Sequence, residues 1–539
     1  MSARMAKRNR VADPKKPRIL IVTPEITYLP EGMGNLAGQM SAKAGGMADV
    51  SASLVAALFD LGADVHVALP HYRRMFHEET AKLVAEELRV YKSRMPNERI
   101  HLAEDRCFYY RDHVYSRGDG NAKLSLAFQR EVINNIMNTV QPDLIHCNDW
   151  MTGLIPAAAR REGIPCLFTV HNIHTHKMTL SQVEDAGIDG AEFWSNLYYS
   201  RPPYNYEESR NTNPIDLQAS GVFAAHYINT VSPTFLQEIV NGWHGFIPDS
   251  IRNEIRNKYY AGCAAGILNA PDPTDNPILD DKIPFRYGPE NHAENKRKNK
   301  LALQHALGLE ENPDAPVFFW PSRLDPVQKG PQLLTDIAYR FLSKYWNDGA
   351  QLAIIANGAY QQPFWDIRSF HGIQGRLGVH NFDGRLSQLG FAGSDFMVMP
   401  SLFEPCGLPR CRRRSTVRSP SPTTRADCTI PWRCSMPPST PATGSSSTRT
   451  TRTDSSGPWT ARWISGGCRA TSATRRSRAS WRNPCTGSTT RPAPSGTSSC
   501  TRRCSTVRSS AISDCPVSDL TFLQVQVVVL GKTRSVGMV

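Results

Sequence analysis

The stretch RILIVTPE (Arg18–Glu25) decides the fold class of this chain. Its aliphatic residues form one short apolar run that ends in Thr, Pro and Glu, as a strand buried on both faces of a parallel sheet does. A glycine-containing loop follows, and then DVSASLVAALFDLG (Asp49–Gly62) with helical spacing. Another strand-like run, ADVHVALP (Ala63–Pro70), comes next. The chain therefore begins with a strand, a helix and a second strand.

The same alternation continues along the chain. DLIHC (Asp143–Cys147) and CLFTVHN (Cys166–Asn172) predict two further strands, with a helix predicted over Trp150–Arg161 between them. The pattern restarts with a strand over Ala315–Arg323 and reaches another over Asp395–Ser401. Strands that alternate with helices favour a doubly wound α/β fold. We therefore expect two Rossmann-like domains that face a crevice, the second of them incomplete.

The composition changes character at Arg410. Residues 410–539 hold 20 Arg and one Lys against four Asp and no Glu, a formal charge of +17, whereas the whole chain carries +13, so that residues 1–409 carry −4. A basic chain usually indicates nucleic acid or an anionic membrane as a partner. Here the excess charge belongs to the tail, which is rich in Ser and Thr and poor in aliphatic residues. Such a composition cannot bury enough apolar surface to fold.

These observations give the expected organisation. We predict a loose basic leader over residues 1–16, an N-terminal Rossmann-like domain over 17–268, a partial C-terminal domain over 269–409, and a low-complexity, disordered basic tail over 410–539. The leader lacks the apolar region of a signal peptide, and no apolar run is long enough to span a membrane. The cysteines include no C-x-x-C pair. We expect a cytoplasmic protein without a metal site, a membrane or a specific nucleic-acid partner.

KAGGMADV (Lys43–Val50) lies between a predicted strand and a predicted helix. Gly45 and Gly46 would let the backbone approach a ligand, and the N-terminus of the helix would offer free N–H groups to a phosphate. Lys43 would add a full positive charge. The alternative is an ordinary loop closed by two glycines, and this motif alone does not decide between the two.

HCNDW and TVHN each end a predicted strand with polar residues. The carboxyl ends of the strands face the ligand crevice in an open α/β sheet, so Asp149, His171 and Asn172 are candidates for substrate binding. The structural alternatives are that Asp149 caps the next helix and that His171 is an interior histidine with its hydrogen bonds satisfied. Neither alternative is excluded by the motifs themselves.

PSRLDPVQKG (Pro321–Gly330) places Arg323 and Lys329 after the first strand of the second domain. Arg offers a planar fork of N–H donors and Lys a point charge, and both suit phosphate oxygens. Glu404 lies in FEPCGL, a turn bounded by Pro and Gly. Each could also be a solvated surface charge. Taken together, the cations and the polar strand ends suit a ligand with phosphates at one end and hydroxyls at the other, such as a nucleotide sugar.

In this order the motifs resemble the bacterial glycogen synthases and plant starch synthases, which are retaining glucosyltransferases of the GT-B fold. The resemblance extends from about Arg18 to Pro409 and includes NTVSPTFLQEI (Asn229–Ile239) and GILNAPD (Gly266–Asp272). It implies that glucose moves from ADP-glucose or UDP-glucose to the non-reducing end of an α-1,4-glucan acceptor. No metal or further cofactor is implied.

The resemblance also implies roles for the candidate residues of both domains. Lys43 with Gly45 and Gly46 would contact the phosphates or the glucose of the donor. Arg323 and Lys329 would hold the pyrophosphate and stabilise it as it leaves.

His171, with Asn172 beside it, would bind the transferred glucose, and Asp149 would lie on the acceptor side. Glu404 would bind the glucose or stabilise the charge that develops on it. Two departures from the family pattern leave the choice of nucleotide open: RLDPVQK is one residue longer than the common spacing, and Phe391 stands where the family often has Tyr.

The tail also resembles the family when its codons are read in a shifted frame. If the codons of Thr416–Trp432 are read one nucleotide earlier, they permit nearly the whole family run Y-G-T-L-P-V-V-H-D-T-G-G-L-H-D-T-V, and Pro422 fails to permit its second Val. Ala442–Ser447 also back-reads to a family-like run. We therefore hypothesise a single-nucleotide frameshift near Arg410. The lost segment would include a Thr-Gly-Gly loop for the donor phosphates, so this chain is expected to be impaired.

Other readings remain. The chain could be another GT-B glycosyltransferase, such as a sucrose or trehalose-phosphate synthase, which would need a site for a small sugar acceptor. It could also be a glucan-binding remnant without catalysis. An RNA-binding protein with a basic tail is a further possibility, although the tail lacks the interleaved aromatic residues that stack on bases.

Overall fold

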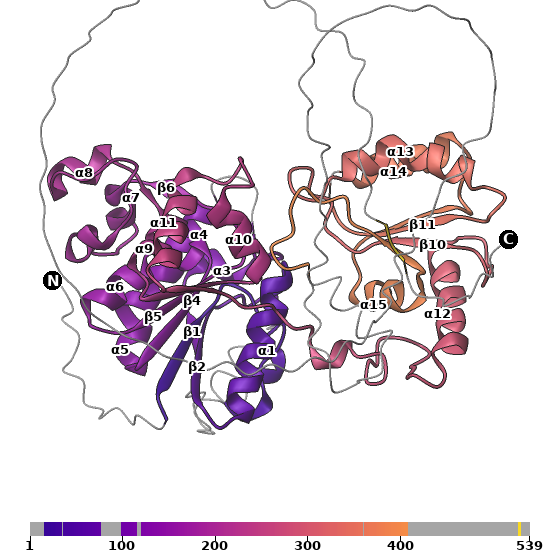
Figure 1. The fold of residues 1–539 in the computed structure, drawn as a ribbon. Helices are drawn as coiled ribbons and strands as arrows, with labels where there is room; N and C mark the ends of the chain where they lie inside the picture. Colours follow the sequence, from indigo (N-terminus) through magenta and orange to yellow (C-terminus); the bar gives the residue numbers. More distant parts are fainter. Residues whose placement is uncertain are drawn as a thin grey trace, which may run out of the picture. The chain divides into compact units, whose positions relative to one another are not determined.

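Two parallel sheets form the framework of the described chain (Figure 1). The computed structural model describes residues 16–34, 36–76, 99–115, 120–358 and 360–407, together with the strand Val527–Val529. The predicted leader lies outside these residues except for Lys16. The segment assigned to the frameshift lies outside them except for that one strand.

The first sheet has seven strands in the order β3-β2-β1-β4-β5-β8-β9, all parallel to their neighbours. The strands are β1 (Arg18–Val22), β2 (Asp64–Pro70), β3 (Ile100–Ala103), β4 (Leu144–Asn148), β5 (Cys166–Val170), β8 (Tyr227–Thr230) and β9 (Ala264–Gly266). The chain builds outward from β1 to β3 and then crosses back to place β4 on the other side of β1. The boundary between β1 and β4 is therefore the point where the strand order reverses, and ligands bind at such a point in open α/β sheets.

Strand β1 lies in the interior of this sheet because its side chains suit burial on both faces. Leu20, Ile21 and Val22 are fully buried, and Ile19 pairs with a residue of β2 on one side and of β4 on the other. The parallel strand predicted from the apolar run Arg18–Glu25 is thus confirmed.

Helices and short turns connect these strands (Figure 1). They are η1 (Glu31–Met33), η2 (Ala37–Gln39), α1 (Gly46–Asp60), α3 (Arg106–Tyr109), α4 (Gly120–Glu131), the π-helical η3 (Val132–Ile136), α5 (Met137–Val140), η4 (Trp150–Thr152), α6 (Ile155–Arg161), α7 (Leu180–Asp185), η5 (Gly190–Glu192), η6 (Trp194–Asn196), α8 (Tyr206–Thr212), α9 (Leu217–Ala224), α10 (Pro233–Asn241) and α11 (Asp249–Tyr260). A small antiparallel ribbon, β6 (Lys177–Met178) with β7 (Ile215–Asp216), lies outside the main sheet.

The helix predicted as one piece over Trp150–Arg161 is divided. A 3-10 turn, η4, comes first, and α6 begins at Ile155. Pro156 occupies the first turn of α6, where its missing N–H and fixed φ are tolerated, whereas in the interior of a longer helix they would not be. Pro156 therefore marks the start of a new helix, where the apolar pattern alone predicted one uninterrupted helix.

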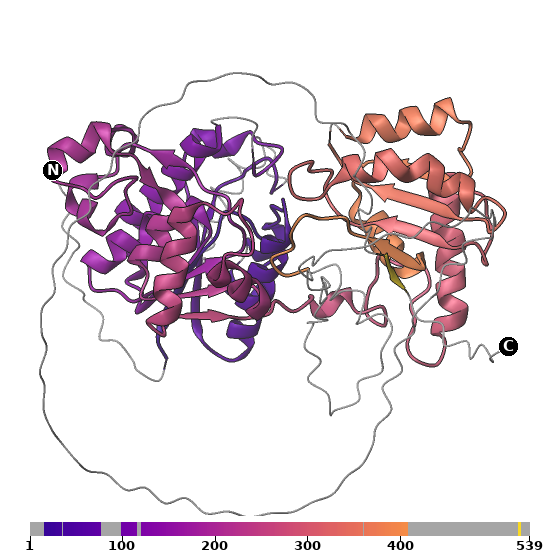
Figure 2. The same cartoon turned by 45° about the horizontal axis from the view of Figure 1, so that its top comes forward.

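The second sheet has the order β12-β11-β10-β13-β14. Its strands are β10 (Val317–Trp320), β11 (Gln351–Ile355), β12 (Leu377–His380), β13 (Phe396–Val398) and β14 (Val527–Val529), and the first four in space are parallel. The helical segments of this part are η7 (Pro273–Asp275), α12 (His292–Leu307), α13 (Pro331–Lys344), α14 (Gln361–Phe370) and α15 (Gly384–Gly393). Helices α13 and α14 cover one face, and α12 and α15 the other (Figures 1 and 2). Its strand order reverses between β10 and β13.

Strand β14 is the one segment of the tail among the described residues. Val527–Val529 pairs antiparallel with β13 at the edge of the second sheet. The surrounding sequence, VQVVVL, is the β-branched run that the tail otherwise lacks, and β-branched residues favour strands. The rest of the tail lies outside the described residues.

The two sheets together confirm the expected α/β class. The strands of the first sheet run from Arg18 to Gly266, and the parallel strands of the second from Val317 to Val398. The predicted domain limits themselves stay predictions.

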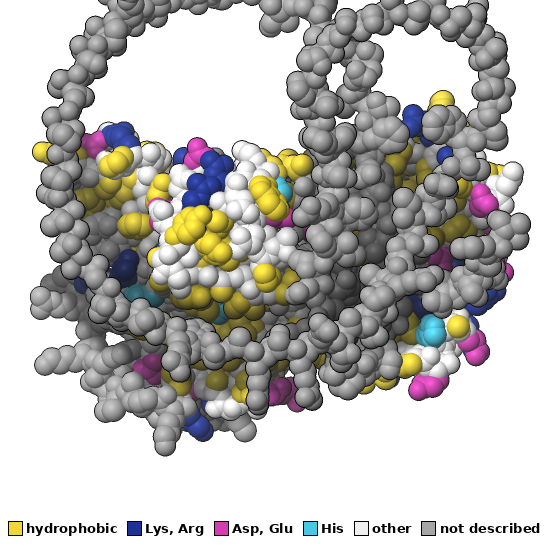
Figure 3. All heavy atoms as spheres, viewed as in Figure 1, with side chains coloured by type: hydrophobic (Ala, Val, Ile, Leu, Met, Phe, Trp, Pro, Cys, Tyr) yellow, Lys and Arg dark blue, Asp and Glu magenta, His cyan; other side chains and the backbone are white. Residues whose placement is uncertain are grey.

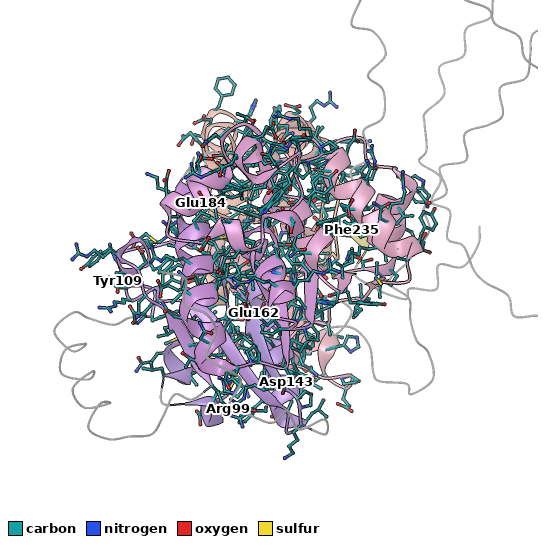
Figure 4. All side chains as sticks on the ribbon, turned by 90° about the vertical axis from the view of Figure 1, so that its left-hand side faces the viewer. Arg99, Tyr109, Asp143, Glu162, Glu184 and Phe235 are labelled. Carbon is teal, nitrogen blue, oxygen red and sulfur yellow. The ribbon has the colours of Figure 1, made fainter. Side chains whose placement is uncertain are left out.

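The described residues carry both basic and acidic side chains on the face seen in Figure 3. In the view of Figure 3, Lys and Arg side chains are interspersed with Asp and Glu. Arg99 and Asp143, labelled in Figure 4, lie near the amino ends of the strands, where Asp143 accepts a hydrogen bond from the backbone N–H of Arg18 at 2.8 Å. Within the described ranges, no helix has the length and apolar character needed to cross a membrane.

Candidate active site

A buried carboxylate organises the loop that follows β1. Glu25 is 2% exposed, and its Oε2 accepts hydrogen bonds from the backbone N–H groups of Ala44 at 2.6 Å and Gly45 at 2.9 Å. Burial raises the pKa of Glu25, and these two hydrogen bonds partly oppose that rise. No motif in the sequence marked Glu25 as a candidate. A signal was present, because Glu25 follows β1 closely at the reversal point, as Asp149 follows β4.

The KAGGMADV loop contains an internal ion pair. Lys43 Nζ lies 2.8 Å from both carboxylate oxygens of Asp49, so the lysine charge is already paired within the motif. Gly45 precedes α1 and Gly46 is its first residue. The Gly45 N–H that could have faced a phosphate instead donates to Glu25. The phosphate-binding role of this loop therefore stays a prediction.

Asp149 fixes the turn after β5 and does not act as a helix cap. Its carboxylate makes no capping bond to η4. Instead Oδ1 accepts from the backbone N–H groups of His171 at 2.7 Å and Asn172 at 3.3 Å. The residue has φ +57°, a conformation that non-glycine residues rarely adopt and that occurs often at functional sites. Burial raises the pKa of Asp149 to about 7 despite these hydrogen bonds.

The His171 ring is held in one tautomer. Its Nε2 lies 2.8 Å from Oδ1 of Asn148, whose amide nitrogen donates to the Val22 carbonyl oxygen at 3.0 Å. Because the Asn148 oxygen must accept, Nε2 carries the proton and Nδ1 is left as an acceptor. Burial lowers the pKa of His171 to about 3, so the imidazole is neutral at physiological pH.

Asn172 has a local role in this structure. Its side-chain Oδ1 accepts from the backbone N–H of Ile173 at 2.8 Å, and its own carbonyl oxygen accepts from Gln218. The side-chain oxygen of Asn172 is thus occupied by the turn itself. Its predicted contact with substrate stays a prediction.

The second sheet brings Lys329 and Glu404 together. Lys329 Nζ lies 2.6 Å from Glu404 Oε1, and their side chains are 13% and 15% exposed. The two residues come from the loops after β10 and β13, the strands that flank the reversal point of this sheet. Arg323, in the same loop as Lys329, is exposed, and among the described residues its guanidinium makes no hydrogen bond or ion pair.

Backbone hydrogen bonds hold the loop that carries Lys329. Asp325 Oδ1 accepts from the backbone of Gln328 at 3.2 Å, and the Asp325 carbonyl oxygen accepts from the Lys329 N–H at 2.9 Å. The Gln328 carbonyl oxygen accepts from Leu402 at 2.8 Å, which ties this loop to the one that contains Glu404. Gly330 has φ +68°, and a Cβ there would lie 2.7 Å from the Pro400 carbonyl oxygen, so glycine is required where α13 begins.

The structure thus forms two groups of candidate residues, one at each reversal point. The first group also contains Tyr115, whose hydroxyl lies 3.5 Å from Glu25 Oε1. No motif marks Tyr115, because its place depends on how distant segments pack. Among the described residues, no three or more His, Cys, Asp and Glu side chains lie together as a metal site would require.

Comparison with known proteins adds a family context. A family described as the starch synthase catalytic domain matches residues 18–252. The glycogen synthase of Cellvibrio japonicus (strain Ueda107) is 30% identical over 397 residues, which cover 68% of this chain and 77% of that protein. The glycogen synthase of Moorella thermoacetica (strain ATCC 39073 / JCM 9320) is 30% identical over 417 residues, which cover 72% and 77%.

A solved structure is similar in fold. The catalytic domain of starch synthase IV from Arabidopsis thaliana, solved bound to ADP and acarbose, has a TM-score of 0.56 and 21% sequence identity. The match covers 74% of this chain and 81% of that one.

Proposed function

Because the chain belongs to the glycogen and starch synthase family of glucosyltransferases and has their GT-B fold, we propose that its reaction transfers glucose from ADP-glucose or UDP-glucose to the non-reducing end of an α-1,4-glucan, with retention of configuration. One observation supports this proposal most directly. Each of the two sheets has polar and charged side chains at the point where its strand order reverses, which is where ligands bind in such folds.

The first sheet supplies groups for the sugar and for the acceptor. His171 Nδ1 is an acceptor on a neutral ring, and so it suits a glucose hydroxyl. Asp149 lies on the acceptor side, where its ionised carboxylate would accept hydrogen bonds from glucan hydroxyls. The loop of Lys43 and the N-terminus of α1 lie at the same edge and suit the donor glucose or its phosphates.

The second sheet supplies the charges for the diphosphate. Lys329 and Arg323 would bind the phosphate oxygens, and their positive charge would stabilise the leaving nucleoside diphosphate without a metal ion or a further cofactor. Glu404, paired with Lys329, would bind the glucose or stabilise the positive charge that develops at its anomeric carbon.

In the proposed reaction the bond between C1 of glucose and the diphosphate oxygen breaks. A bond from the 4-hydroxyl oxygen of the glucan to C1 forms on the same face, and the hydroxyl proton leaves with the nucleoside diphosphate. The enzyme's contribution is to position the two substrates and to stabilise the separated charges. Glu404 is given no role as a nucleophile.

We also propose that this chain, as it stands, turns over slowly. The frameshift hypothesis removes the Thr-Gly-Gly loop, and the second sheet has only four parallel strands among the described residues. The test compares the full chain with a frame-restored chain, in which one nucleotide near the Arg410 codon is corrected. Incorporation of labelled glucose from ADP-glucose and from UDP-glucose into glycogen is measured for both, with Glu404→Gln in the frame-restored chain as the inactive control.

We expect turnover in the frame-restored chain and little in the original. Normal turnover by the purified original chain would contradict the proposed impairment. Absence of turnover in the frame-restored chain with either donor would contradict the proposed reaction.

A glucan-binding protein without catalysis is the second candidate. It is favoured by the seven strands of the first sheet, which hold Asp149 and His171, beside the smaller second sheet. Retention of the original chain on immobilised glycogen, without donor turnover, would support it. A small-sugar acceptor is less well supported, because the relatives at 30% identity are glycogen synthases.

A further inference from the structure

Gln218 is a buried polar residue that the proposed mechanism does not use. It lies in the first turn of α9 and is fully buried. Its backbone N–H donates to Thr175 Oγ1 at 3.1 Å, and its side-chain Nε2 donates to the Asn172 carbonyl oxygen at 3.0 Å. Its side chain therefore reaches the turn whose two N–H groups donate to Asp149.

The amide of Gln218 can adopt only one orientation. Turning it over would place Oε1 against the Asn172 carbonyl oxygen, so that two acceptors would face each other. In the orientation observed, Oε1 is buried and has no hydrogen-bond partner among the described residues. Buried polar atoms are nearly always paired, and exceptions in native structures call for a functional explanation. The unpaired Oε1 of Gln218 costs free energy. In exchange, the two N–H groups of the side-chain amide face the turn after β5.

Those donors connect Gln218 with the site. One donates to the Asn172 carbonyl oxygen, as described. The side chain also lowers the pKa of the Asp149 carboxyl, in opposition to the effect of burial. Asp149 in turn holds the backbone of His171 and Asn172. Gln218, Asp149 and the turn after β5 thus support one another in a closed arrangement.

We propose that Gln218 is a positioning residue, which holds the turn after β5 whose N–H groups fix the Asp149 carboxylate for binding the glucan acceptor. The acceptor role of Asp149 rests on the proposed function. Gln218 itself touches neither substrate nor the reacting atoms, and so it acts through Asp149 and through the backbone of Asn172.

Burial and one neighbouring charge oppose the ionisation of Asp149. Burial raises the pKa of Asp149 most, and Glu25, in the loop after β1, raises it further. Burial, followed by the charges of Glu25 and Asp149, raises the pKa of Tyr115. The ring of His171 is neutral and does not compensate. Burial places the pKa of Asp149 at about 7, so a modest change in its hydrogen bonds changes its charge at physiological pH.

The test uses the full chain and the variants Gln218→Leu, which removes the amide at similar size, and Gln218→Glu, which replaces the N–H donors by an acidic group. Gln304→Leu is the matched control, because Gln304 is also fully buried and its amide bonds a backbone carbonyl, but in α12 of the second sheet. The dissociation constant for maltoheptaose is measured by calorimetry between pH 5.5 and 9.

The original chain should bind more tightly as the pH rises through about 7. In Gln218→Leu the midpoint should move up by about one unit, which lowers the ionised fraction at pH 7 from about half to about one tenth, a roughly fivefold loss of affinity that disappears near pH 9. Gln218→Glu should move the midpoint further, and Gln304→Leu should leave it in place. An unchanged midpoint, or a loss that is equal at every pH, would overturn the proposal.

A second readout works without a ligand. Trp150 follows Asp149 directly. The fluorescence of Trp150 is obtained as the difference between the chain and its Trp150→Phe variant, and its change with pH reports the titration of Asp149 in the free chain. The midpoint of that signal should rise in Gln218→Leu. If it rises although no chain binds maltoheptaose, the Gln218 proposal stands and the acceptor role fails. If maltoheptaose binds and neither midpoint moves, the Gln218 proposal fails and the acceptor role stands.

Discussion

The Lys329 ammonium and the Glu404 carboxylate lie 2.6 Å apart, although 75 positions separate them in the chain. Their loops leave neighbouring parallel strands, and the backbone bond between Gln328 and Leu402 holds the loops together. A cation and an anion at this position have opposite effects on a diphosphate ligand. Removing the charge of Lys329 should therefore weaken ADP binding, whereas removing the charge of Glu404 should not.

Lys329→Gln should weaken ADP binding about tenfold, because a charge-assisted hydrogen bond to a phosphate is lost. Glu404→Gln should leave ADP binding unchanged or make it tighter, because it removes the anion that competes for the lysine. Calorimetric titration of ADP into the full chain measures both, with Lys298→Gln on the exposed side of α12 as control. Parallel losses in both variants would show that the pair is merely structural.

The Asp149 carboxylate should lower stability at neutral pH. Its folded-state pKa, about 7, lies above the ordinary value of an aspartate, so its contribution to stability is full at low pH and is lost as the pH rises toward 7 and above. Asp149→Asn keeps an oxygen for the N–H groups of His171 and Asn172 but removes the charge.

Asp149→Asn should therefore be more stable than the original chain at pH 8, by about 1 kcal/mol or more, and equally stable at pH 4. Urea unfolding at the two pH values measures this difference. Equal effects at both pH values would mean that Asp149 does not titrate in this range.

Lys300 should contribute strongly to the stability of the second sheet. Its Nζ lies 2.6 Å from Asp395 Oδ2 and 3.0 Å from the Ala315 carbonyl oxygen, and its side chain is 8% exposed. Lys300→Met would leave the partly buried Asp395 carboxylate without its cation, at a cost of about 3 kcal/mol. Lys298→Met removes an exposed pair with Glu294 that solvent screens, and it should change stability far less than Lys300→Met does. Urea midpoints of the two variants, measured side by side, test the contrast.

Strand β14 should protect the edge of the second sheet. Only alternate residues of an edge strand bond to their neighbour, so replacing both Val527 and Val528 by Pro removes at least one N–H from the pairing with β13. An unpaired edge promotes association between chains. The double variant should therefore scatter more light than the original at equal concentration. Unchanged scattering would indicate that β14 does not protect this edge.

The sequence predicted those parts of the fold that have a local cause. Continuous apolar runs gave β1 and the buried strands beside it, and polar residues at the ends of strands indicated Asp149 and His171. The separation of η4 from α6 was not predicted, because the helical spacing of apolar residues over Trp150–Arg161 was followed and Pro156 was not treated as a helix start. Strand β14 was missed because three valines carry little weight in a long polar tail.

The site was less accessible to such reasoning. The pairing of Lys43 with Asp49 is local and lies within one motif, yet its geometry depends on how the loop closes. Gln218 comes from a helix 46 positions after the residue that it bonds, and no spacing in the sequence links the two. Contacts of that kind arise from tertiary packing, which one sequence without relatives does not display.

The hydrogen bonds of Asn148 have a consequence for the energetics of binding. Asn148 links Val22, the last residue of β1, to His171, which directly follows β5. These hydrogen bonds hold this edge of the first sheet in place before a ligand binds. Exposed Arg323 must instead give up rotamer freedom when it meets a phosphate. The entropic penalty of forming the complex should therefore fall mainly on the second sheet, and preorganisation should belong mainly to the first.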